Sequence, residues 1–213
     1  MVRVAGSVSY RGMHSLSPSL IVAAQHFATL AQPLEINGVV SDSNAPEHRA
    51  YVMAAVMSAA AAVEAAMNWV AFKLVDGETF SVADNMKRRL FISEWKRDLK
   101  WNPFKDRFNR LEELGTHPVH GFRKGDLFLV VDVRNALMHY EPVWHDHPGR
   151  HGELRADLEG KFPIINAGTL NWFPNSCLSA GCALWVSTTA EKAVKGLAAA
   201  IGVEERFLLP KGP

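Results

Sequence analysis

Long apolar runs with helical spacing dominate the chain, and the alternation typical of strands is almost absent. The first predicted helix has Ser17 as its cap and Pro18 in its first turn, and it stops near Pro33. The longest predicted helix covers residues 47–75, and its small apolar residues permit close packing. These helices predict an all-α domain with the 47–75 helix at its centre.

Irregular segments and two more predicted helices make up the second half of the chain. Asp126 is a plausible cap for a helix that ends before Pro142. Residues 143–175 are rich in histidine, glycine and proline, and they predict an irregular segment around one weak helix or strand candidate. A last amphipathic helix is predicted over residues 176–202, despite two internal glycines.

The composition changes over residues 81–114, which predict two short helices broken at Asn102-Pro103. Within residues 87–110, nine basic residues and three acidic residues give a net charge of +6, and five aromatic residues are interleaved. This mixture can hold single-stranded RNA through phosphate contacts and base stacking, although a core-packed, solvated helix face has the same pattern. The predicted RNA-binding residues are Lys87, Arg88, Arg89, Trp95, Arg97 and Trp101.

The composition limits the size and class of the domain but does not identify its function. With 213 residues, 48% of them hydrophobic, the chain suits one domain, 1–213. Its core is predicted over about 46–76 and 126–202, with an insertion at 77–125. The net charge of +1 excludes the strong positive field of a protein that coats nucleic acid, so an anionic partner must be held locally.

Cysteine use and the N-terminal sequence predict the cellular compartment of the protein. Cys177 and Cys182 match no zinc or redox spacing, and they are predicted to be packed thiols without a disulfide, in a reducing cytoplasm. No signal peptide is visible at the N-terminus. The segment 50–75 is long enough to span a membrane, but three polar residues interrupt it, and a buried helix is predicted instead.

The candidate chemistry lies in "VVDVRNALMHYEP", residues 130–142. Arg134 offers a planar fork for a phosphate, and Asn135 can hold a ribose or phosphate oxygen or brace the arginine. His139 lies in the last turn before Pro142. Because five helical residues rotate a side chain by about 500°, Arg134 and His139 cannot share one face, which predicts a site where two copies of the helix converge.

Polar residues on the longest helix need a partner. Glu64 and Asn68 lie four residues apart and share a face of an otherwise apolar helix. Arg134 is the predicted partner of this pair, in which Glu64 either positions the arginine for a reaction or forms a buried structural ion pair.

The segment "RNALMH" resembles the mark of the HEPN superfamily, an arginine, four to six residues and a histidine near the end of a bundle helix. An alanine-rich helix with Glu64 and Asn68 precedes the motif, and a long helix beginning "SCLSAGCALW" follows it. The resemblance covers most of residues 46–202 and implies a HEPN-like up-and-down helical bundle, in which 77–125 is an inserted basic and aromatic helical segment.

What the resemblance implies about activity is an expectation. Many members are dimeric, metal-independent endoribonucleases of toxin–antitoxin and phage-defence systems, and others are non-catalytic modules that bind RNA, a nucleotide or a protein. In an active member, His139 transfers protons, Arg134 stabilises the phosphate and Asn135 orients the groups, with no metal or cofactor. The implied partners are RNA, a second copy of the chain, and an antitoxin or a nucleotidyltransferase.

Two further interpretations remain open. The protein can be a purely structural dimer with a buried polar network. Histidines and an aspartate in "HDHPGRH" can bind a transition metal, but their spacing matches no known ligand set, and a flexible loop has the same composition. This cluster comprises His145, Asp146, His147 and His151, with His117 and His120 nearby in the sequence.

Overall fold

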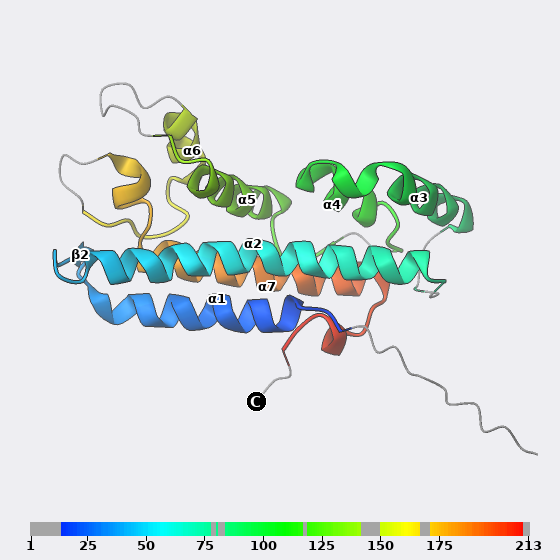
Figure 1. Ribbon diagram of the computed structural model, residues 1–213, viewed down its shortest axis with the longest axis horizontal. Helices are drawn as coiled ribbons and strands as arrows, with labels where there is room; N and C mark the ends of the chain where they lie inside the picture. Colours follow the sequence, from blue (N-terminus) through cyan, green and yellow to red (C-terminus); the bar gives the residue numbers. More distant parts are fainter. Residues whose placement is uncertain are drawn as a thin grey trace, which may run out of the picture.

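The computed structural model describes residues 14–77, 80, 84–116, 119–141, 150–166 and 171–210 (Figure 1). Its main helices are α1 (Ser17–Ala31), α2 (Ala45–Val75), α3 (Asn85–Arg97), α4 (Phe104–Glu112), α5 (Lys124–Met138), α6 (Arg150–Leu158) and α7 (Ala180–Ile201). Short turns are η1 (Gln32–Leu34), η2 (Leu99–Trp101), η3 (Trp172–Ser176) and η4 (Glu205–Phe207), and the two strands are β1 (Glu35–Ile36) and β2 (Val39–Val40).

The molecule is an all-α bundle, which confirms the predicted class. Figure 1 shows α1, α2 and α7 side by side along the long axis, with α5 lying over α2. The colours in Figure 1 show that the direction alternates in the order α1, α2, α5 and α7. Helices α3 and α4 follow α2 in the sequence and cover its C-terminal part, on the same side as α5.

Helix α2 is the central element because its alanines allow neighbours to approach closely. Val52, Ala59, Val63 and Val70 have no exposed surface, and the same is true of many of the alanines between them. The helix is long and apolar enough to cross a membrane, and half of its most apolar window, 50%, is buried inside the bundle. This burial agrees with the prediction of a core helix.

A tight hairpin joins α1 to α2. Strands β1 and β2 pair antiparallel, with Glu35 opposite Val40. The turn between them uses Asn37 (φ 53°) and Gly38 (φ 72°), both in the left-handed region that a two-residue hairpin turn requires. The turn reverses the chain so that α1 and α2 can pack antiparallel.

Several details of the predicted helices are wrong. Ser17 is the first residue of α1 rather than its cap, and its N–H donates to Ser15 Oγ at 3.1 Å. Asp126 lies in the first turn of α5, where it accepts from Lys161, and Arg123 occupies the cap position. Within the segment 143–175, the weak helix or strand candidate overlaps a helix, α6, whose helical spacing of Leu154 and Leu158 buries both side chains.

The two thiols are buried and free, as predicted. Cys177 precedes α7 and Cys182 lies in its first turn. A hydrogen bond to Cys182 and burial raise the pKa of the Cys177 thiol well above its usual value. The Cys177 sulfur is therefore held as a neutral packing group.

Glu35 connects three elements at one end of the bundle. Its Oε2 accepts from the N–H of Ala180, the first residue of α7, at 2.7 Å, and it lies 3.2 Å from His48 Nε2 of α2. Burial acts to raise the pKa of Glu35, but the hydrogen bonds from His48 and Ala180, with the charge of His48, outweigh it and place the pKa below its usual value of 4.5. The ionised carboxylate therefore stabilises the fold.

The substitution Glu35→Gln is expected to lower the free energy of unfolding at neutral pH by about 1 kcal/mol, because the charge on these hydrogen bonds is lost. Since the folded pKa of Glu35 is depressed, the difference between the two proteins should be full above its usual value of 4.5 and should disappear as the pH falls through the lowered pKa. Urea unfolding at a series of pH values measures this. A difference that is independent of pH, or an equal effect of the exposed control Glu205→Gln, contradicts the assignment.

Candidate functional site

The polar pair on α2 receives a buried arginine from α4. Arg107 Nη2 lies 2.5 Å from Glu64 Oε1, and Arg107 Nη1 donates to Asn68 Oδ1 at 3.1 Å. The Arg107 residue is only 7% exposed. Because a buried guanidinium must be paired, Glu64 and Asn68 fix α4 on α2.

Arg134, the predicted partner, does contact Glu64, but Arg107 is the nearer arginine and the one that also binds Asn68. Arg107 is one of the nine basic residues of 87–110, but it lies on the apolar face of α4. Phe104 and Leu111 lie at helical spacing from it, three residues before and four after, and Leu111 and the adjacent Phe108 have no exposed surface. This spacing was the signal in the sequence that Arg107 is buried.

Arg134 is a second and weaker partner of the same carboxylate. Its Nη2 lies 3.7 Å from Glu64 Oε2, and its Nη1 donates to Asn135 Oδ1 at 2.8 Å. The Arg134 side chain is 34% exposed, so its guanidinium is within reach of a solvent-borne anion. Glu64 thus holds one buried arginine from α4 and one accessible arginine from α5.

His139 lies at the other side of the motif, at the C-terminal end of α5. Its N–H donates to the carbonyl of Asn135 at 2.9 Å, and its side chain is exposed. With Asn135 it lines a groove of about 270 Å³ between α5 and α6. The other residues that line this groove are Asp132, Ala136, His151, Glu153, Leu154 and Asp157.

The surroundings of Arg134 and His139 differ, as the predicted helical rotation requires. Arg134 lies against Glu64 of α2, whereas His139 opens into the α5–α6 groove. Three carboxylates line that groove, and the ammonium of Lys105 neutralises one of them, Asp132, at 3.0 Å. Within one protomer, the histidine therefore has an acidic environment that repels phosphate, and Asn135 is the residue that contributes to both sides.

The predicted RNA-binding segment is only partly a free basic surface. Arg110 pairs with Glu94 and Glu113, and Arg97 lies 3.1 Å from Asp98. The hydrogen bonds from Arg110 to Glu94 and then to Glu113 raise the pKa of the guanidinium. The Arg88 side chain is half-buried, and Arg107 is the buried arginine described above.

What remains on α3 is a small set of exposed cations. Lys87, Arg89 and Lys96 are exposed, and among the described residues they have no ion-pair partner. Trp101 is 79% exposed beside Lys100, whereas Trp95 is half-buried and stacks on Phe91. Figure 1 shows α3 near the C-terminal end of α2, far from α6 and the end of α5 that carries His139. The two predicted regions are therefore not brought together in one chain.

The histidine cluster lies mostly outside the described residues, which exclude His117, His145, Asp146 and His147. His151 is buried, with its ring 4.9 Å from that of Phe173 and stacked on Tyr140 at 6.1 Å. His120 is exposed. In the part of the chain that the structure describes, no group of three metal-binding side chains comes together.

Comparisons of the chain with protein-family models, with curated proteins and with solved structures find no match. A function is therefore inferred from the residues and their geometry alone.

The unequal sharing of Glu64 predicts unequal stability effects. Arg107→Met removes the buried partner of Glu64 and Asn68, and it should lower the free energy of unfolding by roughly 3 kcal/mol. Arg134→Met removes a more exposed and more distant partner and should cost less than about 1 kcal/mol. Urea unfolding of the two variants measures the difference. Equal losses, or a larger loss for Arg134→Met, would show that Arg134 is the structural arginine.

Proposed function

We propose that the protein is a metal-independent endoribonuclease of the HEPN type. The observation that carries this proposal is the arrangement at the end of α5. There an accessible Arg134, braced by Asn135 at 2.8 Å, and an exposed His139 occupy one helix of an all-α bundle. The "RNALMH" segment that resembles the HEPN motif thus has its arginine and its histidine within reach of a ligand.

The complete site takes residues from two copies of the chain. In one protomer, Arg134 lies toward α2 and His139 opens into an acidic groove, so a phosphate at His139 lacks a cation. A second α5 packed antiparallel against the first supplies the Arg134 of one copy to the His139 of the other. This arrangement places the exposed ends of both helices, and two histidines, in one cleft.

The reaction is a transesterification within the RNA. One His139 accepts the proton of the ribose 2′-hydroxyl while the 2′ oxygen forms a bond to phosphorus. The bond from phosphorus to the 5′ oxygen breaks, and the same imidazole, now protonated, gives that oxygen its proton. The products are a 2′,3′-cyclic phosphate and a 5′-hydroxyl, so atoms and charge balance without a metal.

Arg134 stabilises the charge that develops on the phosphate oxygens, which is commonly the largest catalytic contribution of a fixed cation. Asn135 braces the guanidinium through its Oδ1 and leaves its amide to donate to the substrate. Glu64 is a positioning residue, since it contacts Arg134 at 3.7 Å from the α2 side. Helices α2 and α5 thus hold the arginine before RNA binds.

The biological setting is part of the proposal. A ribonuclease of this kind acts on cytoplasmic RNA in a bacterial toxin–antitoxin or phage-defence system, with an antitoxin or a nucleotidyltransferase as its partner. A non-catalytic HEPN module that binds RNA, a nucleotide or a protein is the second candidate. It is favoured by one observation: Glu64 and Asn135 already satisfy Arg134 within the chain.

In an RNA digest with EDTA present, the parent protein should cleave a single-stranded oligoribonucleotide and leave 2′,3′-cyclic phosphate ends. His139→Ala and Arg134→Ala should each reduce the rate by at least about a hundredfold, because proton transfer or charge stabilisation is lost. His26→Ala, which changes an exposed histidine of α1, is the matched control and should cleave normally. Cleavage that persists in His139→Ala, or that needs a divalent metal, refutes the mechanism.

Mixing the two inactive variants tests the composite site. If Arg134 of one copy serves His139 of the other, heterodimers of Arg134→Ala and His139→Ala keep one intact site, and part of the cleavage should return. Sedimentation of the parent protein at micromolar concentration should show a dimer. If the parent protein cleaves but the mixture does not, each copy contains a complete site.

RNA affinity is expected to depend on the exposed cations of α3. The triple substitution of Lys87, Arg89 and Lys96 by glutamate should weaken RNA binding and flatten its dependence on salt, because fewer counterions are released. Lys195→Glu, on the exposed side of α7, is the control for a change of surface charge. Fluorescence anisotropy of a labelled RNA measures both. Unchanged affinity in the triple variant makes α3 an ordinary solvated face.

A further inference from the structure

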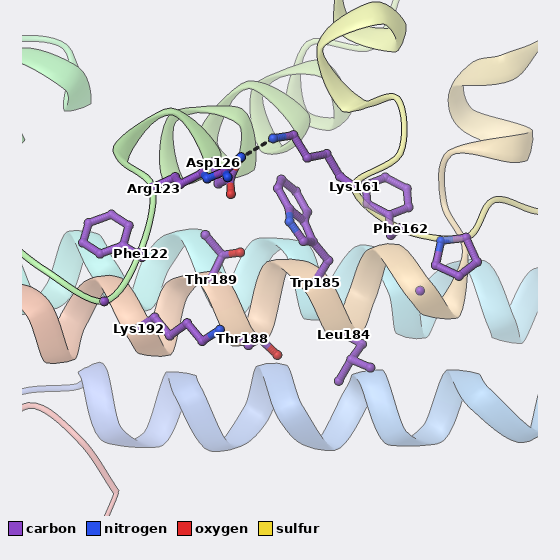
Figure 2. Close-up of a pocket in the computed structure, with 13 residues that line it drawn as sticks. Phe122, Arg123, Asp126, Lys161, Phe162, Leu184, Trp185, Thr188, Thr189 and Lys192 are labelled. Atoms are coloured by element: carbon purple, nitrogen blue, oxygen red, sulfur yellow. Dashed lines mark hydrogen bonds and ion pairs between the residues drawn. The ribbon is translucent and has the colours of Figure 1, made fainter.

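A second cavity lies away from the proposed cleavage site, and we infer that it binds a small organic anion with a flat aromatic ring. The cavity holds about 710 Å³ and is bounded by the N-terminal end of α5, the segment 161–163 after α6, and the N-terminal half of α7 (Figure 2). Small-molecule sites in proteins commonly measure roughly 300–1,000 Å³. The size therefore suits one ligand of this class.

Two glycines of α7 fix the ends of the cavity. A Cβ on Gly181 would lie 2.8 Å from Pro163, and a Cβ on Gly196 would lie 2.7 Å from the His120 carbonyl. Both glycines thus allow a neighbouring segment to rest directly on the helix backbone, which explains their presence within an amphipathic helix. The two glycines are fifteen positions apart, which spans roughly 22 Å of helix, and the cavity lies in this interval.

Aromatic side chains form the inner walls. Figure 2 shows Trp185 rising from α7 toward α5, with Phe122 at one end of the cavity and Phe162 at the other. The rings of Phe162 and Trp185 lie 5.4 Å apart at an interplanar angle of 41°, and both side chains are half-buried. Aromatic faces that stay partly open offer a stacking surface for a planar ring.

A hydroxyl in the wall of the cavity favours a polar ligand over an apolar one. Thr189 is only 7% exposed, and among the described residues its hydroxyl has no hydrogen-bond partner. Figure 2 shows it beside Trp185 on the side of α7 that faces α5. Because this hydroxyl is open to the cavity, a ligand oxygen or nitrogen can form a hydrogen bond with it in place of water.

The charge of the cavity favours an anion. Three cations and one carboxylate line it, and Lys161 Nζ neutralises Asp126 at 2.7 Å. Arg123 and Lys192 are exposed and have no ion-pair partner among the described residues. Two uncompensated positive charges beside aromatic walls match a ring that bears a carboxylate or a phosphate.

Titration calorimetry on the full chain tests this inference with four probes: adenosine monophosphate, indole-3-acetate, neutral indole and ribose 5-phosphate. At least one aromatic anion should bind at micromolar to millimolar concentration, and more tightly than both the neutral ring and the ring-free phosphate. Comparison of the two aromatic anions decides between a phosphate and a carboxylate. No binding of either, or equal binding of indole or ribose 5-phosphate, overturns the inference.

Three variants locate the binding in this cavity. Lys192→Gln should weaken it by about tenfold through loss of a charge-assisted contact, and Thr189→Val, which keeps the shape, should weaken it by several-fold. Lys195→Gln, one turn further along α7 and outside the cavity, is the matched control and should bind like the parent protein. Equal affinity of all three variants overturns the assignment. So does a change of oligomeric state in Trp185→Ala, which would make the cavity a protein interface.

Discussion

Burial of the alanine-rich helix α2 is the constraint on which the rest of the structure depends. Its small side chains contribute little apolar area each, so the helix is stable only if neighbours cover it closely on several sides. Helices α1 and α7 provide this cover on one side, and α5, α3 and α4 provide it on the other (Figure 1). Arg134 and the exposed cations of α3 lie on these covering elements.

The polar pair on α2 shapes how the second layer attaches. An apolar seam alone lets a covering helix slide, whereas Glu64 and Asn68 accept specific bonds from Arg107 and so define where α4 lies. The same carboxylate reaches Arg134 of α5. Both ends of α5 border a possible binding site: its first turn borders the aromatic cavity, and its C-cap residue is His139 in the α5–α6 groove. A rigid helix between two sites favours fixed geometry at each.

The sequence predicts most of the bundle because its main signal is hydrophobic periodicity. Helices α1, α2, α5 and α7 are long and periodic, and the punctuation by Pro18, Pro46 and Gly202 marks their ends. Helix α6 is short, and it directly follows a stretch rich in histidine, glycine and proline. The composition of this region therefore made the helical spacing of its two buried leucines a weak signal, and the choice between helix and strand stayed open.

Prediction of the site failed where it depended on which partner comes nearest in space. Arg134 was a reasonable partner for Glu64, and it does contact this carboxylate, but α4 brings Arg107 closer. The sequence gives no distance between α4 and α5 on the surface of α2. The apolar face of α4 indicates that Arg107 is buried. A net charge taken over residues 87–110 does not distinguish this buried arginine from the exposed cations. The net charge of a helix does not show which of its faces carries each charged residue.

The division of one carboxylate between two arginines has a thermodynamic consequence. Any anion that draws Arg134 away from Glu64 leaves this carboxylate to Arg107 alone, so ligation at α5 changes the energy with which α4 is held on α2. By reciprocity, a partner that shifts α4 must alter the affinity of Arg134 for that anion by the same factor. Helices α4 and α5 are thus coupled through the Glu64 side chain. A partner that binds the surface formed by α3 and α4 can therefore change anion binding at Arg134 of α5.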